Sequence, residues 1–207
     1  MENILGVYKR AYDPRNPVIC MDESPTQLIK ETKTPIKMKP GREAKYDYEY
    51  WRNGVCNIFM SNEPLSGKRY VKVTKQKTKK DWAMFISEIA EQNIDAEKII
   101  LVMDNYGTHK PGALYEIFPP KKAKAILDRF EFVYTPKHGS WLNMAEIELN
   151  VLMGQCLKRR IDNIDTVKTE VDAWQKDRNN NKAKINWRFE TDNARIKLKH
   201  LYPKLEY

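Results

Sequence analysis

The sequence predicts an α/β domain in which a mixed sheet, partly antiparallel and partly parallel, is flanked by helices. Up to residue 74, short strand-like segments are separated by turn signals, which is typical of an antiparallel meander. After residue 78, apolar residues recur at helical spacing, and the helical segments alternate with short apolar runs. The predicted order is βββαβαβα, with right-handed crossovers. A chain of 207 residues is long enough to bury one proper core.

The composition indicates which partners and which cellular compartment to expect for this protein. A net charge of +9 favours an anionic partner such as nucleic acid or a membrane surface. The longest apolar run, Ile99 to Met103, is far too short to cross a membrane, and the N-terminus has no apolar signal region, so we expect a soluble protein of the cytoplasm. Cys20, Cys56 and Cys156 have no metal-binding spacing, and we expect reduced, buried thiols.

The first half of the chain predicts three strands. Residues 17–21 are apolar and stop at the acidic pair Asp22-Glu23, and a loop is expected over 30–43. Segments 46–51 and 55–60 flank Arg52-Asn53-Gly54, and the Asn-Gly pair predicts a tight hairpin there. Residues 69–74 alternate in the manner of a third, half-exposed strand.

The second half predicts helices and parallel strands. A helix begins at the Thr78-x-x-Asp81 signal, and residues 98–103 form a strand buried on both faces that ends at Asp104. Residues 130–134 are expected to form another strand. Helical patterns cover the remaining segments: 111–129, interrupted at Pro119-Pro120, then 144–160, 166–178 and 192–201.

Two carboxylates, Asp22 and Asp104, follow predicted strands directly. Functional groups collect at the carboxyl ends of parallel strands, so the two side chains face each other if their strands are neighbours. The alternative for either residue is an ordinary turn or capping role.

The helix that begins near Met144 supplies a third carboxylate. Its predicted apolar arc consists of Ala145, Leu149, Leu152, Met153 and Cys156. Glu146 lies at the edge of this arc, whereas Glu148 falls on the polar side. A carboxylate beside a core needs a cationic partner, which is either a metal ion or a buried lysine or arginine.

Three converging carboxylates form a hard-oxygen site that suits two Mg²⁺ or Mn²⁺ ions. Such a pair of ions flanks a phosphodiester, activating the attacking oxygen and stabilising the leaving one. A basic chain fits the polyanionic substrate that this chemistry implies.

Three sequence blocks carry a family resemblance: VICMDES (18–24), LVMDNYGTHKPGALYEIF (101–118) and YTPKHGSWLNMAEIELNVL (134–152). They resemble the catalytic domain of bacterial insertion-sequence transposases related to the mariner group, which are DDE enzymes with a ribonuclease-H-like fold. The resemblance implies that Asp22, Asp104 and Glu146 are the catalytic and metal-binding residues. It covers nearly the whole chain, including a C-terminal helical tail at about 162–207.

The resemblance implies metal-dependent cleavage of DNA at transposon ends, followed by transfer of the cut strand into target DNA by a homodimer. Only 21 residues precede Asp22, too few for the family's helix-turn-helix region, so we expect that module to be absent or separately encoded. Two alternatives stay open: another ribonuclease-H-like nuclease, or a catalytically inactive DNA-binding remnant.

Polar and aromatic residues near the three carboxylates are candidates for DNA contact, through phosphates or base stacking. These are His109, Lys137, His138, Trp141 and Asn143. The alternatives are loop-stabilising histidines and a core role for Trp141. Seven basic residues between Lys68 and Lys80 form either a second DNA contact or a solvated face.

Overall fold

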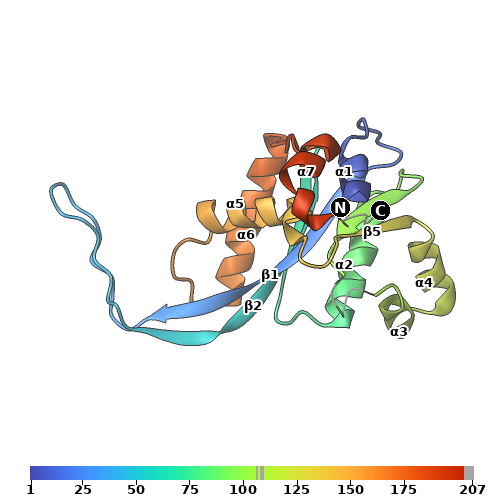
Figure 1. The fold of residues 1–207 in the computed structure, drawn as a ribbon. Helices are drawn as coiled ribbons and strands as arrows, with labels where there is room; N and C mark the ends of the chain where they lie inside the picture. Colours follow the sequence, from blue (N-terminus) through green and yellow to red (C-terminus); the bar gives the residue numbers. More distant parts are fainter. Residues whose placement is uncertain (106, 108–109, 203–207) are drawn as a thin grey trace.

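The fold is known from a computed structural model, which describes residues 1–105, 107 and 110–202. One five-stranded sheet with the order β3-β2-β1-β4-β5 runs through the molecule, with helices on both sides (Figure 1). Its strands are β1 (Val18–Glu31), β2 (Tyr50–Glu63), β3 (Lys68–Thr74), β4 (Ile99–Met103) and β5 (Phe130–Tyr134). The mixed sheet predicted from the sequence is confirmed: β1, β2 and β3 are antiparallel, whereas β1, β4 and β5 are parallel.

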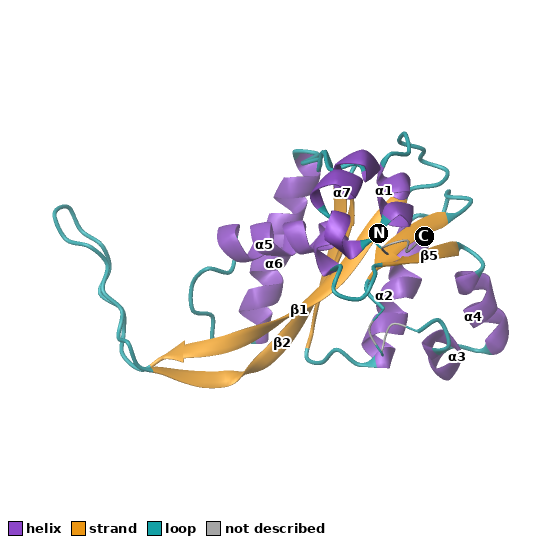
Figure 2. Cartoon of the chain, in the orientation of Figure 1, coloured by secondary structure: helices purple, strands orange, loops and turns teal. Residues whose placement is uncertain are grey.

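The predicted hairpin at Asn53-Gly54 is wrong. β2 passes straight through these residues and pairs along its length with β1, and the two strands project as a long ribbon (Figure 2). Gly54 has φ +97°, and the β1–β2 register shifts opposite it, between Gln27 and Ile29. The Asn-Gly pair therefore forms a bulge, because a backbone that needs positive φ serves a bulge as well as a turn.

The tight turn lies instead between β2 and β3, over residues 64–67. Gly67 has φ +76° and its N–H donates to the Glu63 carbonyl at 2.9 Å. A Cβ atom on Gly67 would lie 2.5 Å from the backbone carbon of Lys182, so only glycine fits this turn.

The strand predicted to stop at Asp22 also continues further, to Glu31. Its parallel pairing with β4 covers only Val18–Cys20, and beyond Cys20 the remaining strand pairing is with β2. A proline is tolerated in a strand with one neighbour, which explains why Pro25 does not end β1. Asp22 therefore lies inside a strand, two residues past the parallel part of the sheet.

The later elements agree closely with the sequence pattern. Every residue of β4 is buried, as expected for a strand covered on both faces. The helices and short 3₁₀ segments (η) are α1 (Glu2–Tyr8), α2 (Lys79–Gln92), α3 (Ala113–Ile117), α4 (Pro120–Leu127), η1 (Ser140–Leu142), α5 (Met144–Gln155), α6 (Ile164–Asn180), α7 (Thr191–Lys197) and η2 (Lys199–Leu201). Thr78 and Asp81 form the predicted capping box of α2. Helix α1 was not predicted, and α5 ends five residues earlier than expected.

Two hydrophobic cores pack against the sheet, one on each face. On one face, α2, α3 and α4 pack around Trp82, Phe85 and Phe59. On the other, α1, α5, α6 and α7 cover alternate strand residues such as Cys20 and Val102. Both faces are thus closed, as the α/β class requires.

The cysteines are free thiols. Cys20 and Cys56 are buried as expected, whereas Cys156 is half-buried. Burial raises the pKa of the Cys20 thiol to about 12, which makes it inert as a nucleophile. In the described part of the chain, no helix is both long enough and apolar enough to span a bilayer.

Candidate active site

Strand geometry brings the first two predicted carboxylates to one face of the sheet. Side chains alternate along a strand, so Asp22 points to the same side as Cys20, and Asp104 follows the side of Val102. Cys20 and Val102 both belong to the core under α5. Asp22 and Asp104 therefore emerge on the face where α5 begins, and Glu146 lies in the first turn of that helix.

Asp22 is half-buried, and it interacts electrostatically with Asp104 and Glu146. Burial raises its pKa from 3.8 to about 7, and the negative charges of Glu23, Asp104 and Glu146 add to this effect. The Glu23 N–H acts in the opposite direction, since it donates to Asp22 Oδ1 at 2.8 Å. Burial is therefore the main cause of the shift, and the neighbouring acidic groups contribute a smaller part of it.

Asp104 lines a hollow of about 410 Å³, and residues of the turn after β5 line its other side. Lys137 and His138 line this hollow and are exposed. His138 has φ +61°, a left-handed conformation that histidine adopts more readily than most residues. Two cationic or neutral donors thus stand beside an acidic residue at an open surface. His109, the other predicted histidine, lies outside the described residues.

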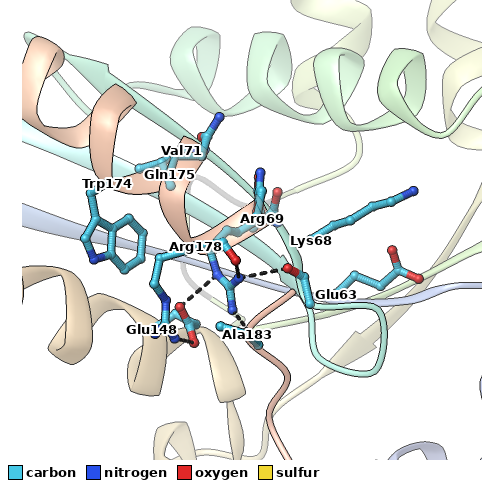
Figure 3. Close-up of polar contacts among 12 residues, drawn as sticks. Glu63, Lys68, Arg69, Val71, Glu148, Trp174, Gln175, Arg178 and Ala183 are labelled. Carbon is cyan, nitrogen blue, oxygen red and sulfur yellow. Dashed lines mark hydrogen bonds and ion pairs between the residues drawn. The ribbon is translucent and has the colours of Figure 1, made fainter. Parts of the chain in front are cut away.

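Of the two glutamates of α5, Glu146 lies at the edge of the buried arc as predicted, whereas Glu148 does not lie where the sequence placed it. Glu146 is half-buried, but Glu148, assigned to the polar side, is 1% exposed. Its Oε2 lies 2.8 Å from Arg69 Nε, and its Oε1 accepts from Arg178 Nη2 at 2.8 Å (Figure 3). The error has a simple cause: the buried arc of α5 is rotated relative to the predicted one. It extends to Met144 and contains Glu148, whereas Met153 and Cys156 at its other edge are only half-buried.

Asn143 does not lie at a surface that DNA could touch. Its side chain is 1% exposed and accepts a hydrogen bond from the Ala145 N–H at 3.1 Å, capping α5. Its Nδ2 donates to the Met21 carbonyl at 2.7 Å and to Asp22 Oδ2 at 3.3 Å. Trp141, in contrast, is 42% exposed and contacts Phe189 edge-on, so part of its ring is accessible.

The basic segment between Lys68 and Lys80 is mostly engaged within the protein. Arg69 is buried against Glu148, and Lys72 pairs with Glu88. Lys77 and Lys79 pair with Glu23 and Glu116 at 3.5 and 3.1 Å. Because at least these four basic residues form ion pairs within the protein, the segment is neither a bare cationic surface nor a purely solvated face.

The three carboxylates fit a hard divalent cation by their chemistry, because all their donor atoms are oxygens. Within residues 1–105, 107 and 110–202, however, no three acidic, histidine or cysteine side chains are close enough to enclose an ion as they stand. Asp22 nonetheless interacts electrostatically with both other carboxylates, whose negative charges add to the effect of burial in raising its pKa.

Asp22→Asn is expected to stabilise the metal-free protein at pH 8. The pKa of Asp22 is raised from 3.8 to about 7 on folding. Between these values the folded state binds more protons than the unfolded state, so wild-type stability falls as pH rises through this window and stays low above it. Asparagine removes that loss. Melting temperatures measured with chelator from pH 4 to 8 check this. The melting temperature of the variant relative to that of the wild type should increase as pH rises, and a constant difference across this range would contradict the prediction.

Solved structures share this fold. The Mos1 mariner paired-end complex with Mn has a TM-score of 0.58 at 18% identity, covering 88% of this chain and 54% of that one. The Mos1 strand transfer complex gives 0.58 at 16%, covering 84% and 51%. The catalytic domain of Mos1 mariner transposase gives 0.53 at 14%, covering 90% and 91%.

The chain thus spans about half the length of the first two proteins and nearly all of the isolated catalytic domain. These similarities confirm the ribonuclease-H-like fold. The comparison with curated proteins found no match. A family model described as DDE superfamily endonuclease matches residues 17–168, a stretch that includes Asp22, Asp104 and Glu146. Since this match covers most of the chain, the chain belongs to the DDE superfamily endonuclease family.

Proposed function

We propose that this chain is the catalytic domain of a transposase, which cuts DNA at transposon ends and joins the cut strand to target DNA. The observation that carries the proposal is the electrostatic grouping of Asp22 with Asp104 and Glu146 within a DDE endonuclease fold. The structural similarity to the Mos1 strand transfer complex supports strand transfer as the second step.

In this proposal Asp22, Asp104 and Glu146 hold two Mg²⁺ or Mn²⁺ ions. When bound, such ions activate the attacking oxygen and stabilise the leaving oxygen of a phosphodiester. The protein's part is to position the carboxylates: Asp22 from β1, Asp104 after β4, and Glu146 from the first turn of α5. The similarity to a Mos1 complex with Mn supports the choice of ion.

Lys137 and His138 are proposed to contact the DNA backbone, because they are exposed in the hollow that Asp104 shares. The exposed part of Trp141 is available for stacking on a base. His109 keeps the same proposed role. The chain is proposed to act in the bacterial cytoplasm, at the nucleoid.

The active complex is proposed to be a homodimer. The ribbon formed by β1 and β2, with the connecting residues 32–49, projects from the body of the molecule (Figure 1). It exposes large apolar side chains, including Met38 at 75%, Tyr48 at 85% and Trp51 at 67%. Large apolar side chains exposed on one projecting segment are typical of a protein interface. The mass of the protein–DNA complex in analytical ultracentrifugation tests the dimer.

The products of the reaction test the proposed function. Wild-type protein is incubated with Mg²⁺ or Mn²⁺, a labelled transposon-end duplex and a supercoiled target plasmid. A transposase gives a cut end and a covalent joint between the labelled strand and the plasmid. Cleavage without joining would favour the alternative nuclease, and DNA binding with no cleavage in either metal would favour the inactive remnant.

A further inference from the structure

We infer that Asn143 is a positioning residue that fixes the geometry between Asp22 and Glu146, through one side chain that bridges β1 and the start of α5. The inference rests on the proposed metal-dependent site. It assigns Asn143 a role different from the DNA contact predicted from the sequence.

The contacts of Asn143 reach both elements at once. Its Nδ2 donates to the Met21 carbonyl at 2.7 Å and to Asp22 Oδ2 at 3.3 Å, which ties it to β1. Its Oδ1 accepts from the Ala145 N–H at 3.1 Å, and its backbone carbonyl accepts from the Glu146 N–H at 3.1 Å. One buried residue therefore touches the first carboxylate and the turn that carries the third.

These contacts also orient the Asp22 carboxylate. Its Oδ1 accepts from the Glu23 N–H at 2.8 Å, while its Oδ2 accepts from Asn143. Because each oxygen has a donor from a different direction, rotation of the carboxylate is restricted. Hydrogen bonds that orient a metal ligand commonly govern how tightly the metal binds.

The chemistry at position 143 requires an amide. Serine or threonine can cap a helix, but each has one hydroxyl hydrogen, which cannot donate to Met21 and Asp22 at the same time. Aspartate could accept from Ala145, but it would place a second carboxylate against Asp22 in a buried position. At this size, only asparagine combines an oxygen that accepts from the helix with a separate amino group whose two hydrogens can donate to both Met21 and Asp22.

A second capping asparagine supplies a matched control. Asn163 caps α6 by accepting from the Thr166 N–H at 2.8 Å, and this cap lies at the far end of the α5–α6 connection. Asn143→Ser and Asn163→Ser therefore make the same chemical change at two helix starts. Only the first change removes a donor from Asp22.

The experiment measures Mn²⁺ binding by calorimetry at 10 °C, with circular dichroism to show that each variant is folded. Asn143→Ser is expected to weaken Mn²⁺ binding by roughly 10–100-fold, whereas Asn163→Ser leaves it unchanged. Asn143→Thr repeats the test with another capping residue. In the cleavage assay, kcat should fall for Asn143→Ser and KM for DNA should stay constant.

Three outcomes separate the possibilities. Wild-type Mn²⁺ affinity in both Asn143 variants would overturn the inference. A raised KM for DNA with unchanged Mn²⁺ binding would overturn it too, and would restore the DNA-contact interpretation. Absence of Mn²⁺ binding by the wild-type protein would instead refute the proposed metal site itself.

Discussion

Glu148→Ala is expected to destabilise the protein by about 3–5 kcal/mol, because it leaves Arg69 as an unpaired charge in the core. Both side chains of the Arg69–Glu148 pair are 1% exposed. Burial lowers the pKa of the Arg69 guanidinium, and Glu148 opposes that effect. The loss is a large share of the roughly 5–15 kcal/mol by which ordinary domains are stable. Urea unfolding measures it directly.

A surface pair serves as the control. Glu170 pairs with Arg159, and both side chains are substantially exposed, at 40% and 57%. Glu170→Ala should change stability by no more than about 1 kcal/mol. A Glu148→Ala variant that unfolds at the same urea concentration as Glu170→Ala would contradict the burial of this pair.

The buried pair has a second consequence that can be measured. Arg69 also donates to the Gly67 carbonyl at 2.8 Å, and Arg178 joins Glu148 from α6 (Figure 3). Replacing the pair together, as Arg69→Met with Glu148→Leu, removes both charges and should recover much of the lost stability. The comparison is made with Glu148→Leu alone, which fills the space but leaves Arg69 unpaired. Recovery relative to that variant would show that the unpaired charge, rather than a cavity, causes the loss.

Glu146→Gln is expected to lower the rate of DNA cleavage by roughly 10³-fold or more while leaving the fold intact, since metal ions supply several kcal/mol of transition-state stabilisation. Glu146 is half-buried and keeps its volume in this variant, so stability should change little. Asp104→Asn and Asp22→Asn should lose activity to a similar extent. Single-turnover cleavage in Mg²⁺ and Mn²⁺, with urea unfolding alongside, checks both parts.

Glu131→Gln is the matched control, because the carboxyl of Glu131 on β5 is 48% exposed. It should cleave at the wild-type rate. Cleavage by Glu146→Gln at the rate of Glu131→Gln would show that Glu146 does not belong to the catalytic set. A large loss of stability in Glu146→Gln would show that its role is structural, as that of Glu148 is.

The sequence determined those features that depend on local chemistry. The unbroken apolar run 99–103 predicted a strand buried on both faces, and Thr78 with Asp81 predicted the start of α2. The motif blocks around Asp22 and Asp104 led to the right family because residue identity at fixed spacing is visible in a sequence.

Only the tertiary structure decided which strands pair and which side chains are buried. Asn53-Gly54 satisfies either a turn or a bulge, and the choice was made by β1, which offers a long partner on which β2 can continue. The apolar arc predicted for α5 extends to Met153 and excludes Glu148, whereas the arc that is buried in the structure extends to Met144 and includes Glu148. The cations that compensate Glu148 come from β3 and α6, far away in the sequence, and Asn143 joins two elements by contacts that spacing alone does not encode.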